Sequence, residues 1–343
     1  MDLETFAPRL IAWQQTHGRH DLPWQVSDAY AVWISEIMLQ QTQVETVLPY
    51  YARFMARFPD LASLAAAPED AVLALWSGLG YYARGRNLHA AARLIAAQHG
   101  GLFPRDSEAI AALPGIGRST AAAIAAFAYG ERRAILDGNV KRVFCRLFGI
   151  DGWSGTKAVE NRLWQLAEGL LPEHGIRAYT QGLMDLGATL CRRTRPDCLR
   201  CPFGDDCVAH RDGRQAELPA ARPRKALPEK ETAMLLLWHG GEIMLQKRPP
   251  SGIWGGLWSL PECPAEDDPV EAARRLGYHA EAMAALPSLT HTFSHFHLRI
   301  HPRPLAVPQR PAGMAEPGLL WLTPAEAAQA ALPTPVRRII ESL

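Results

Sequence analysis

Residues 113–120 read LPGIGRST, a stretch with two glycines between segments that have the apolar spacing of helices. The flanking helices are expected at 107–112 and 118–129. Glycine permits a tight turn and lets the backbone approach another surface closely. A helix that begins near Arg118 would present free backbone N–H groups, which bind phosphate without reading base sequence. Taken alone, a Gly-x-Gly turn is usually structural, so its meaning depends on the surrounding chain.

The helical pattern continues on both sides of this turn. Alanine-rich amphipathic segments separated by Gly and Pro fill most of residues 1–212. The spacing of Val32, Trp33, Ile37 and Met38 marks a buried helix face. Further helices are expected at 31–57, 68–77, 86–99, 140–147, 158–170 and 178–190.

The composition changes after the helical half. Residues 213–230 are rich in proline and basic side chains, which is typical of a linker. Short β-like runs follow at 233–238, 243–247, 289–291 and 295–301, with helical segments near 269–276 and 324–331. We therefore expect an all-α domain at 1–212, a linker at 213–230 and an α+β domain at 231–343.

Charge and hydropathy exclude some classes of protein. The 343 residues are 48% hydrophobic, but no apolar run is long enough to cross a membrane, and residues 1–22 lack the pattern of a secretory signal. A cytoplasmic protein is expected. The net charge of +1 does not indicate nucleic acid. The clearest basic cluster, which a solvated surface would also explain, is Arg192, Arg193, Arg195 and Arg200.

Four of the six cysteines lie close together, with the spacing Cys191-x6-Cys198-x2-Cys201-x5-Cys207. Disulfides are rare in cytoplasmic proteins, so this cluster indicates a metal site. Four thiolates can hold one zinc ion or one iron–sulfur cluster, and ligand softness does not choose between them. Two disulfides or inert cysteines remain the alternatives.

Two carboxylates suit acid–base chemistry. In SEIMLQQTQV at 35–44, Glu36, Gln40 and Gln43 would share one face of the expected helix. A polar stripe on a buried helix is costly without partners, and amides match the edges of bases, although a solvated face is the alternative. Asp137 follows an apolar run and precedes Gly138, a position equally typical of a helix cap.

These motifs, in this order, resemble the MutY family of adenine DNA glycosylases, which belongs to the helix-hairpin-helix superfamily of endonuclease III. The resemblance covers nearly the whole chain. The stretch 113–120 resembles the hairpin, and the cysteine spacing resembles the iron–sulfur cluster loop. Other matching stretches are LPWQ at 22–25, the Glu36 segment, GLGYYAR at 78–84, the Nudix-like 247–258 and HTFSHFH at 291–297.

The resemblance implies an enzyme of base excision repair that flips adenine, mispaired with 8-oxoguanine or guanine, out of double-stranded DNA and hydrolyses its glycosidic bond. It implies Glu36 as the acid, Asp137 as the stabiliser of the sugar cation, Asn139 beside it, and a 4Fe-4S cluster on Cys191, Cys198, Cys201 and Cys207. It further implies a monomer associated with the bacterial nucleoid. The DNA- and base-binding residues that it indicates are Trp24, Gln25, Gln40, Gln41, Leu79, Gly80, Tyr81, Gly115, Gly117, Arg118, Ser119, Phe293, Ser294 and His295.

Differences from related families reduce the number of reactions that the sequence allows. Relatives with lyase activity carry lysine where this chain has Ser119, so hydrolysis without strand cleavage is expected, with Lys141 as a source of slow trapping. Glutamates such as Glu262, Glu266 and Glu271 follow Pro261, but the Arg-Glu…Glu-Glu arrangement by which Nudix hydrolases bind magnesium is absent. Core roles remain the alternative for Trp24 and Tyr82. The competing interpretations are a pyrimidine-specific lyase, a damage-binding or redox-sensing protein without turnover, and a nucleotide hydrolase.

Overall fold

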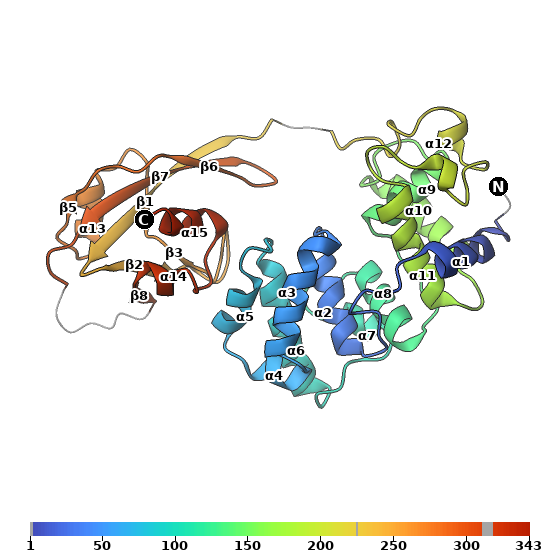
Figure 1. The fold of residues 1–343 in the computed structure, drawn as a ribbon, viewed down its shortest axis with the longest axis horizontal. Coiled ribbons are helices and arrows are strands. Elements are labelled where there is room, and N and C mark those ends of the chain that lie inside the picture. The colour runs from blue at the N-terminus through green and yellow to red at the C-terminus, as the bar shows by residue number, and fades with distance from the viewer. Residues whose placement is uncertain (1–2, 224–225, 311–317) are drawn as a thin grey trace. The chain divides into compact units, whose positions relative to one another are not determined.

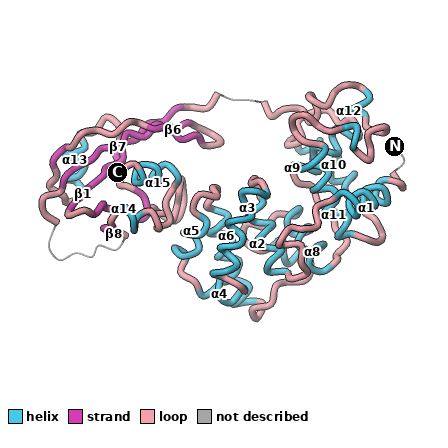
Figure 2. Tube along the Cα trace, viewed as in Figure 1, coloured by secondary structure: helices cyan, strands magenta, loops and turns pink. Residues whose placement is uncertain are grey.

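The computed structural model describes residues 3–223, 226–310 and 318–343, and the chain forms two compact units. One unit contains Met1–Ala66 and Asn87–Arg224, and the other contains Ala67–Arg86 and Lys225–Leu343. Figure 1 labels the elements along the chain, and Figure 2 shows that the strands lie in the C-terminal part. In the described ranges, no helix is long and apolar enough to cross a membrane.

The first unit is helical, as expected. A core joins its two ends, because the ring of Phe6 stacks on that of Phe203 with centroids 4.7 Å apart and meets Phe144 edge-on. Its elements are α1 (Phe6–His17), α2 (Ala29–Leu39), α3 (Val44–Arg57), α4 (Leu61–Ala66), most of α6 (Ala83–Gln98), α7 (Ser107–Ala111), α8 (Arg118–Tyr129), α9 (Gly138–Leu147), α10 (Lys157–Gly169), α11 (Ile176–Asp185), a π-helical turn (Leu186–Leu190), a 3₁₀ turn (Cys198–Arg200) and α12 (Val208–Arg211).

Helix α2 is buried along its length because nine of its eleven residues are apolar or small and buried. The side chain of Asp28 caps its start by accepting the N–H of Ala31. The single helix expected at 31–57 is wrong, since α2 ends at Leu39 and α3 begins at Val44. Between them Gln41 adopts a left-handed backbone with φ of 59°. Gln40 and Gln43 therefore both lie beyond the end of α2, and the helix face predicted for Glu36, Gln40 and Gln43 does not form.

The second unit is built on a mixed sheet, which confirms the α+β class. At its centre β1 (Glu229–His239) and β7 (His297–Ala306) run parallel, from Glu229 opposite His297 to Trp238 opposite Ala306. The other pairings are antiparallel. The remaining elements are β2 (Glu242–Lys247), β3 (Trp258–Ser259), β4 (Glu262–Cys263), α13 (Pro269–Arg275), β5 (Glu281–Ala282), β6 (Leu289–Thr292), β8 (Leu319–Leu322), α14 (Pro324–Ala327) and α15 (Thr334–Glu341).

Strands β6 and β7 form a hairpin whose turn is Phe293 to Phe296. The N–H of Phe293 donates to the carbonyl of Phe296 at 2.9 Å. The strand expected from His295 therefore begins two residues later, at His297, because the turn uses the residues before it. The side chains of Ser294 and His295 are exposed at the tip.

The second unit also takes in helix α5 (Glu69–Trp76) and the loop that follows it. The hydroxyl groups of Ser77 and Tyr82 both donate to the carbonyl of Leu332, at 2.8 and 3.2 Å. The indole of Trp258 donates to Asp70 at 3.3 Å. Residues 67–86 are thus part of the packed structure around the sheet.

Candidate active site

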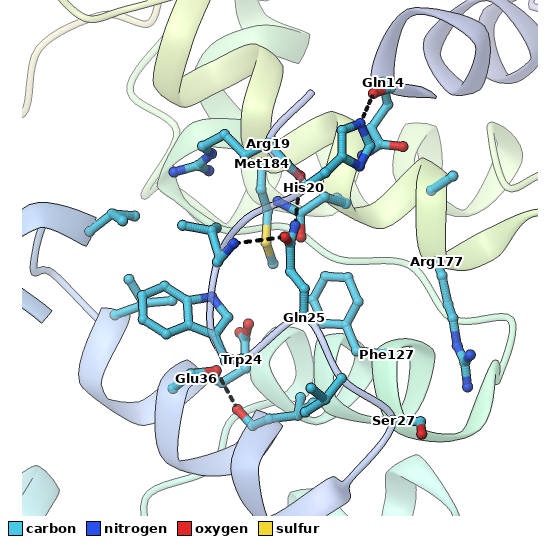
Figure 3. A pocket seen from close by; sticks show the side chains of 18 residues that line it. Gln14, Arg19, His20, Trp24, Gln25, Ser27, Glu36, Phe127, Arg177 and Met184 are labelled. Carbon is cyan, nitrogen blue, oxygen red and sulfur yellow. Dashed lines mark hydrogen bonds between the residues drawn. The ribbon is translucent and has the colours of Figure 1, made fainter. Parts of the chain in front are cut away.

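A cavity of about 530 Å³ opens in the helical unit, between the loop before α2 and helices α2, α8 and α11. Figure 3 shows the side chains that line it, with Trp24, Gln25 and Phe127 around the central space. The walls combine an aromatic and apolar surface with a few polar groups, which is typical of small-molecule sites. The residues that line it include Arg19, Trp24, Gln25, Glu36, Phe127 and Gln181.

Glu36 supplies a carboxyl group to this cavity from helix α2. Burial raises its pKa to about 8, and the charge of Asp137 adds to the rise. A carboxyl with this pKa holds its proton at neutral pH and can donate it to a bound group. The effect of Asp137 on Glu36 also shows that the two carboxyls lie within electrostatic range.

Asp137 is the cap of helix α9, and its carboxylate accepts the N–H of Val140 at 2.8 Å. The amide of Asn139 also donates to it, at 3.4 Å. Burial raises the pKa of Asp137, while these hydrogen bonds and the charge of Arg142 oppose the rise. The structure therefore shows the capping role and, through Glu36, electrostatic contact with the cavity. These are compatible roles rather than alternatives.

Arg142 connects this carboxylate to the cysteine segment. Its guanidinium donates to the side chain of Asn139 and to the carbonyl of Gly187, both at 2.8 Å. It also donates to the carbonyl of Cys191 at 2.8 Å. A planar guanidinium with several fixed donors suits such a junction, because it holds three segments in one geometry.

The glycine turn has the expected form, with α7 and α8 on either side. Gly115 has φ of 77°, and a Cβ atom there would lie 2.7 Å from the Cβ of Asn87, so glycine is required. Gly117 caps α8 and faces open space. Arg118 forms an ion pair with Glu168 and lies 3.8 Å from the ring centroid of Trp164.

Ser119 has an intramolecular partner. Its hydroxyl accepts the backbone N–H of Leu136 at 2.9 Å, directly before Asp137. Lys141, the other residue considered for trapping, forms an ion pair with Glu160 at 2.5 Å. Its amine is therefore engaged within the helical unit.

The other predicted base-binding residues of this unit divide into two groups. Trp24 is buried, lines the cavity and meets Tyr51 edge-on at 5.2 Å. Gln25 also lines the cavity, but its amide closes the preceding loop by binding the backbone of Leu22 and Arg19. Gln40 donates to Thr120 at 3.3 Å, and Gln41 is exposed. Neither Gln40 nor Gln41 is among the residues that line this cavity.

Sequence reasoning missed the contribution of α11. Gln181 and Arg19 line the cavity, and both bind the fully buried carboxylate of Asp185, at 2.8 and 2.7 Å. A carboxylate in the apolar run GLMDLG was the available signal, since a buried charge requires partners. Phe127 of α8 and Met184 of α11 complete the missed wall.

The four clustered cysteines are half-buried, and none of them takes part in a disulfide. Burial raises the pKa of Cys201 to about 12, and the charges of Cys191, Cys207 and Cys198 add to it, so the four sulfurs are close. Within the described parts of the chain, no three His, Cys, Asp or Glu side chains have the arrangement of a metal site. The buried Arg146 lies beside them, with a nitrogen 3.4 Å from the sulfur of Cys191.

The second unit carries the remaining predicted residues. Tyr81 is 55% exposed and has a left-handed backbone with φ of 49°, next to Gly80 with φ of 77°. Leu79 and Tyr82 are buried, so Tyr82 has the core role that was considered for it. Phe293, Ser294 and His295 form the turn between β6 and β7 described above.

Comparison with known proteins places the chain among DNA repair enzymes. Residues 34–168 match the HhH-GPD superfamily of base excision DNA repair proteins, and 232–342 match the NUDIX domain. The chain is 36% identical to an adenine DNA glycosylase of Buchnera aphidicola subsp. Acyrthosiphon pisum (strain APS), across 98% of this chain and 97% of that protein. It is 34% identical to an adenine DNA glycosylase of Homo sapiens, across 98% of this chain and 74% of that protein.

Solved structures of DNA glycosylases and of endonuclease III match the helical part of this chain. A thermostable thymine-DNA glycosylase matches 61% of this chain and 97% of its own, with a TM-score of 0.56 and 30% identity. An endonuclease III in a non-covalent DNA complex matches 62% of this chain and 98% of its own, with a TM-score of 0.54. At 19% identity, this match shows that the fold is the same.

Proposed function

Because the chain belongs to the adenine DNA glycosylase family, we propose that it hydrolyses the N-glycosidic bond of adenine mispaired with 8-oxoguanine or guanine in duplex DNA. The observation that supports this most is the position of the Glu36 carboxyl in a cavity, where burial and the charge of Asp137 raise its pKa to about 8. Hydrolysis of the bond between the sugar and the nucleobase needs one acid and one carboxylate, in the manner of glycoside hydrolysis.

In this proposal the flipped adenine occupies the cavity beside Trp24, whose indole offers a stacking surface. Glu36 gives its proton to a ring nitrogen, and the bond from C1′ of the sugar to the base breaks. Asp137 stabilises the cationic sugar, either directly or through a covalent intermediate. The oxygen of water then bonds to C1′, and the water proton passes to a carboxylate.

We propose that no strand cleavage accompanies base removal. A lyase needs a free amine that attacks the sugar. The matching position holds Ser119, whose hydroxyl binds the backbone of Leu136, and the nearby Lys141 is paired with Glu160. Both contacts support a monofunctional enzyme.

We propose a 4Fe-4S cluster held by Cys191, Cys198, Cys201 and Cys207. The donor chemistry suits such a cluster, because four thiols lie within residues 191–207 and Arg146 offers a positive charge beside one of them. When bound, a cluster would cross-link residues 191–207. Base removal needs no step at this site, so we assign the cluster a structural role. The exposed Arg192, Arg193, Arg195 and Arg200 would face DNA phosphate.

In the second unit, Tyr81 is proposed to wedge into the base stack, and Ser294 and His295 to contact the oxidised guanine. The Nudix-like sheet is proposed to recognise an oxidised purine without hydrolysing nucleotides. Glu262, Asp267 and Glu271 are each paired with an arginine, which supports this view. The protein is proposed to act as a monomer and to associate with the bacterial nucleoid.

The test is product analysis under single-turnover conditions. Duplexes carry 8-oxoguanine opposite either adenine or thymine, and wild type is compared with Glu36→Gln. We expect free adenine from wild type only, no thymine release, and strand breaks only after alkali. Absence of adenine release from the wild type would refute the activity, whereas strand breaks without alkali would show a lyase.

A further inference from the structure

The loop between β2 and β3, Pro249–Leu257, holds Trp254 in an unusual conformation. Trp254 has φ of 54° and is only 7% exposed. A bulky residue in the left-handed region is strained, and such strain persists only where the surroundings fix it. Here the N–H of Gly256 binds the carbonyl of Pro249 at 2.9 Å, and that of Leu257 binds Trp254 at 3.1 Å.

One side of this loop supports the β6–β7 turn. The Trp254 ring lies 5.3 Å from that of Phe293 and 5.7 Å from that of His291. Phe293 in turn stacks on the buried Phe296, with centroids 4.6 Å apart and planes 22° apart. The exposed Ser294 and His295 therefore stand on an aromatic base to which Trp254 contributes from outside the hairpin.

The other side of the same loop meets the start of helix α6. Arg86 donates a hydrogen bond to the carbonyl of Gly255. A Cβ atom on Gly256 would lie 3.5 Å from Arg86 and 3.6 Å from Leu73, so the loop backbone packs against α5 and α6. These helices flank the Tyr81 loop.

The Tyr81 loop is itself fixed to these helices. Both Trp76 and Arg84 donate to the carbonyl of Gly80, at 3.3 and 3.2 Å. The guanidinium of Arg84 lies 5.5 Å from the ring centroid of Tyr81. The Trp254 loop thus contacts the Phe293 turn directly and packs on the two helices that hold the Tyr81 loop.

We propose that Trp254 is a positioning residue that fixes the Phe293–His295 turn relative to Tyr81, and that recognition of the 8-oxopurine base depends on it. This rests on the proposed function. Trp254 does not touch DNA in this proposal and acts through Phe293. Its loss should therefore reduce the preference for 8-oxoguanine over guanine and leave the chemistry at Glu36 intact.

The test compares single-turnover adenine release from 8-oxoguanine:adenine and guanine:adenine duplexes, for wild type, Trp254→Ala and the control Trp321→Ala. Trp321 lies on β8 of the same unit, where it packs on Arg310 and Tyr278. We expect Trp254→Ala to lower the ratio of the two rate constants roughly tenfold, equivalent to about 1.4 kcal/mol. Trp321→Ala should keep the wild-type ratio.

A double-mutant cycle separates positioning from general damage. If Trp254 acts through Phe293, Trp254→Ala combined with Phe293→Ala should discriminate no worse than Phe293→Ala alone. Additive losses, an unchanged ratio in Trp254→Ala or an equal loss in Trp321→Ala would each overturn the inference. If Trp254→Ala does not fold, Trp254→Phe in the same cycle gives the coupling. Failure of the wild type to release adenine would instead refute the proposed function.

Discussion

Asp137 raises the pKa of Glu36 through its charge, although the two carboxyls belong to different helices, α9 and α2. Burial is the larger cause, and the two effects together raise the pKa of Glu36 to about 8. Burial raises the pKa of Asp137 as well, and its hydrogen bonds with Val140 and Asn139 and the charge of Arg142 oppose that rise. The proposed reaction uses Glu36 as the acid and Asp137 as the anionic stabiliser.

The pKa of Glu36 predicts a pH-dependent stability. The ordinary value of 4.5 applies to the unfolded chain and about 8 to the folded protein, so the folded state binds the proton more tightly between them. The free energy of unfolding should therefore fall as pH rises through this window. Glu36→Gln cannot ionise, and near the upper end it should exceed wild type by roughly 1–3 kcal/mol. Denaturant unfolding at both ends of the window checks this, and identical pH slopes would contradict it.

Asp137→Asn should separate catalysis from folding. Asparagine caps a helix as well as aspartate does, so the free energy of unfolding should change by less than about 0.5 kcal/mol. Base release should nevertheless fall by roughly 10²–10³-fold, because the anion is lost. Asp137→Ala, the control, should in addition lose about 1 kcal/mol of stability with the cap. Near-normal base release by Asp137→Asn would exclude the proposed role.

Local sequence signals predicted α8 well and the break after α2 not at all. Gly117 precedes α8 and Gly130, with φ of 72°, follows it, so both ends carry a residue that sets the boundary. Between Leu39 and Val44 the sequence offers only amides and Thr42, with neither glycine nor proline. The turn there depends on tertiary packing, which overrides a continuous helical pattern.

The site was predictable only where one segment carries the signal. Short motifs predict Glu36, Asp137 and Trp24 as site residues. The structure places Glu36 and Trp24 at one cavity, and Asp137 is not among the residues that line it. Arg19 and Gln181 were missed because they meet at the buried Asp185, which is 166 residues from Arg19 in the sequence. The contact between Trp254 and Phe293 joins two loops that no local pattern relates.

The ion pair of Arg19 with the buried Asp185 should contribute strongly to the stability of the helical unit around the cavity. Asp185→Asn removes the charge that Arg19 and Gln181 both bind, leaving the guanidinium without its counter-ion. Breaking a buried pair in this way costs roughly 3–5 kcal/mol. The control Asp151→Asn breaks an exposed pair with Arg214 and should change the free energy of unfolding far less than Asp185→Asn does. Equal unfolding free energies for the two variants would argue against this.

Metal content should distinguish the clustered cysteines from the isolated ones. If the proposed cluster is present, Cys201→Ser should reduce bound iron and lower the thermal unfolding midpoint, because it replaces one of the four proposed thiol ligands. Cys263, on β4 of the second unit, is the control, and Cys263→Ser should retain the iron. Elemental analysis of the purified proteins gives the answer, and zinc in place of iron would correct the identity of the cofactor.

The most direct test of the central claim is the pH dependence of single-turnover adenine release by the wild-type enzyme, with DNA binding measured at each pH. If Glu36 is the acid, the rate constant should be highest while it is protonated and decline as pH rises through about 8, approaching tenfold per pH unit. At low pH it should decline again when Asp137 becomes protonated. A rate constant that stays level or increases well above pH 8, with binding intact, would contradict the role of Glu36.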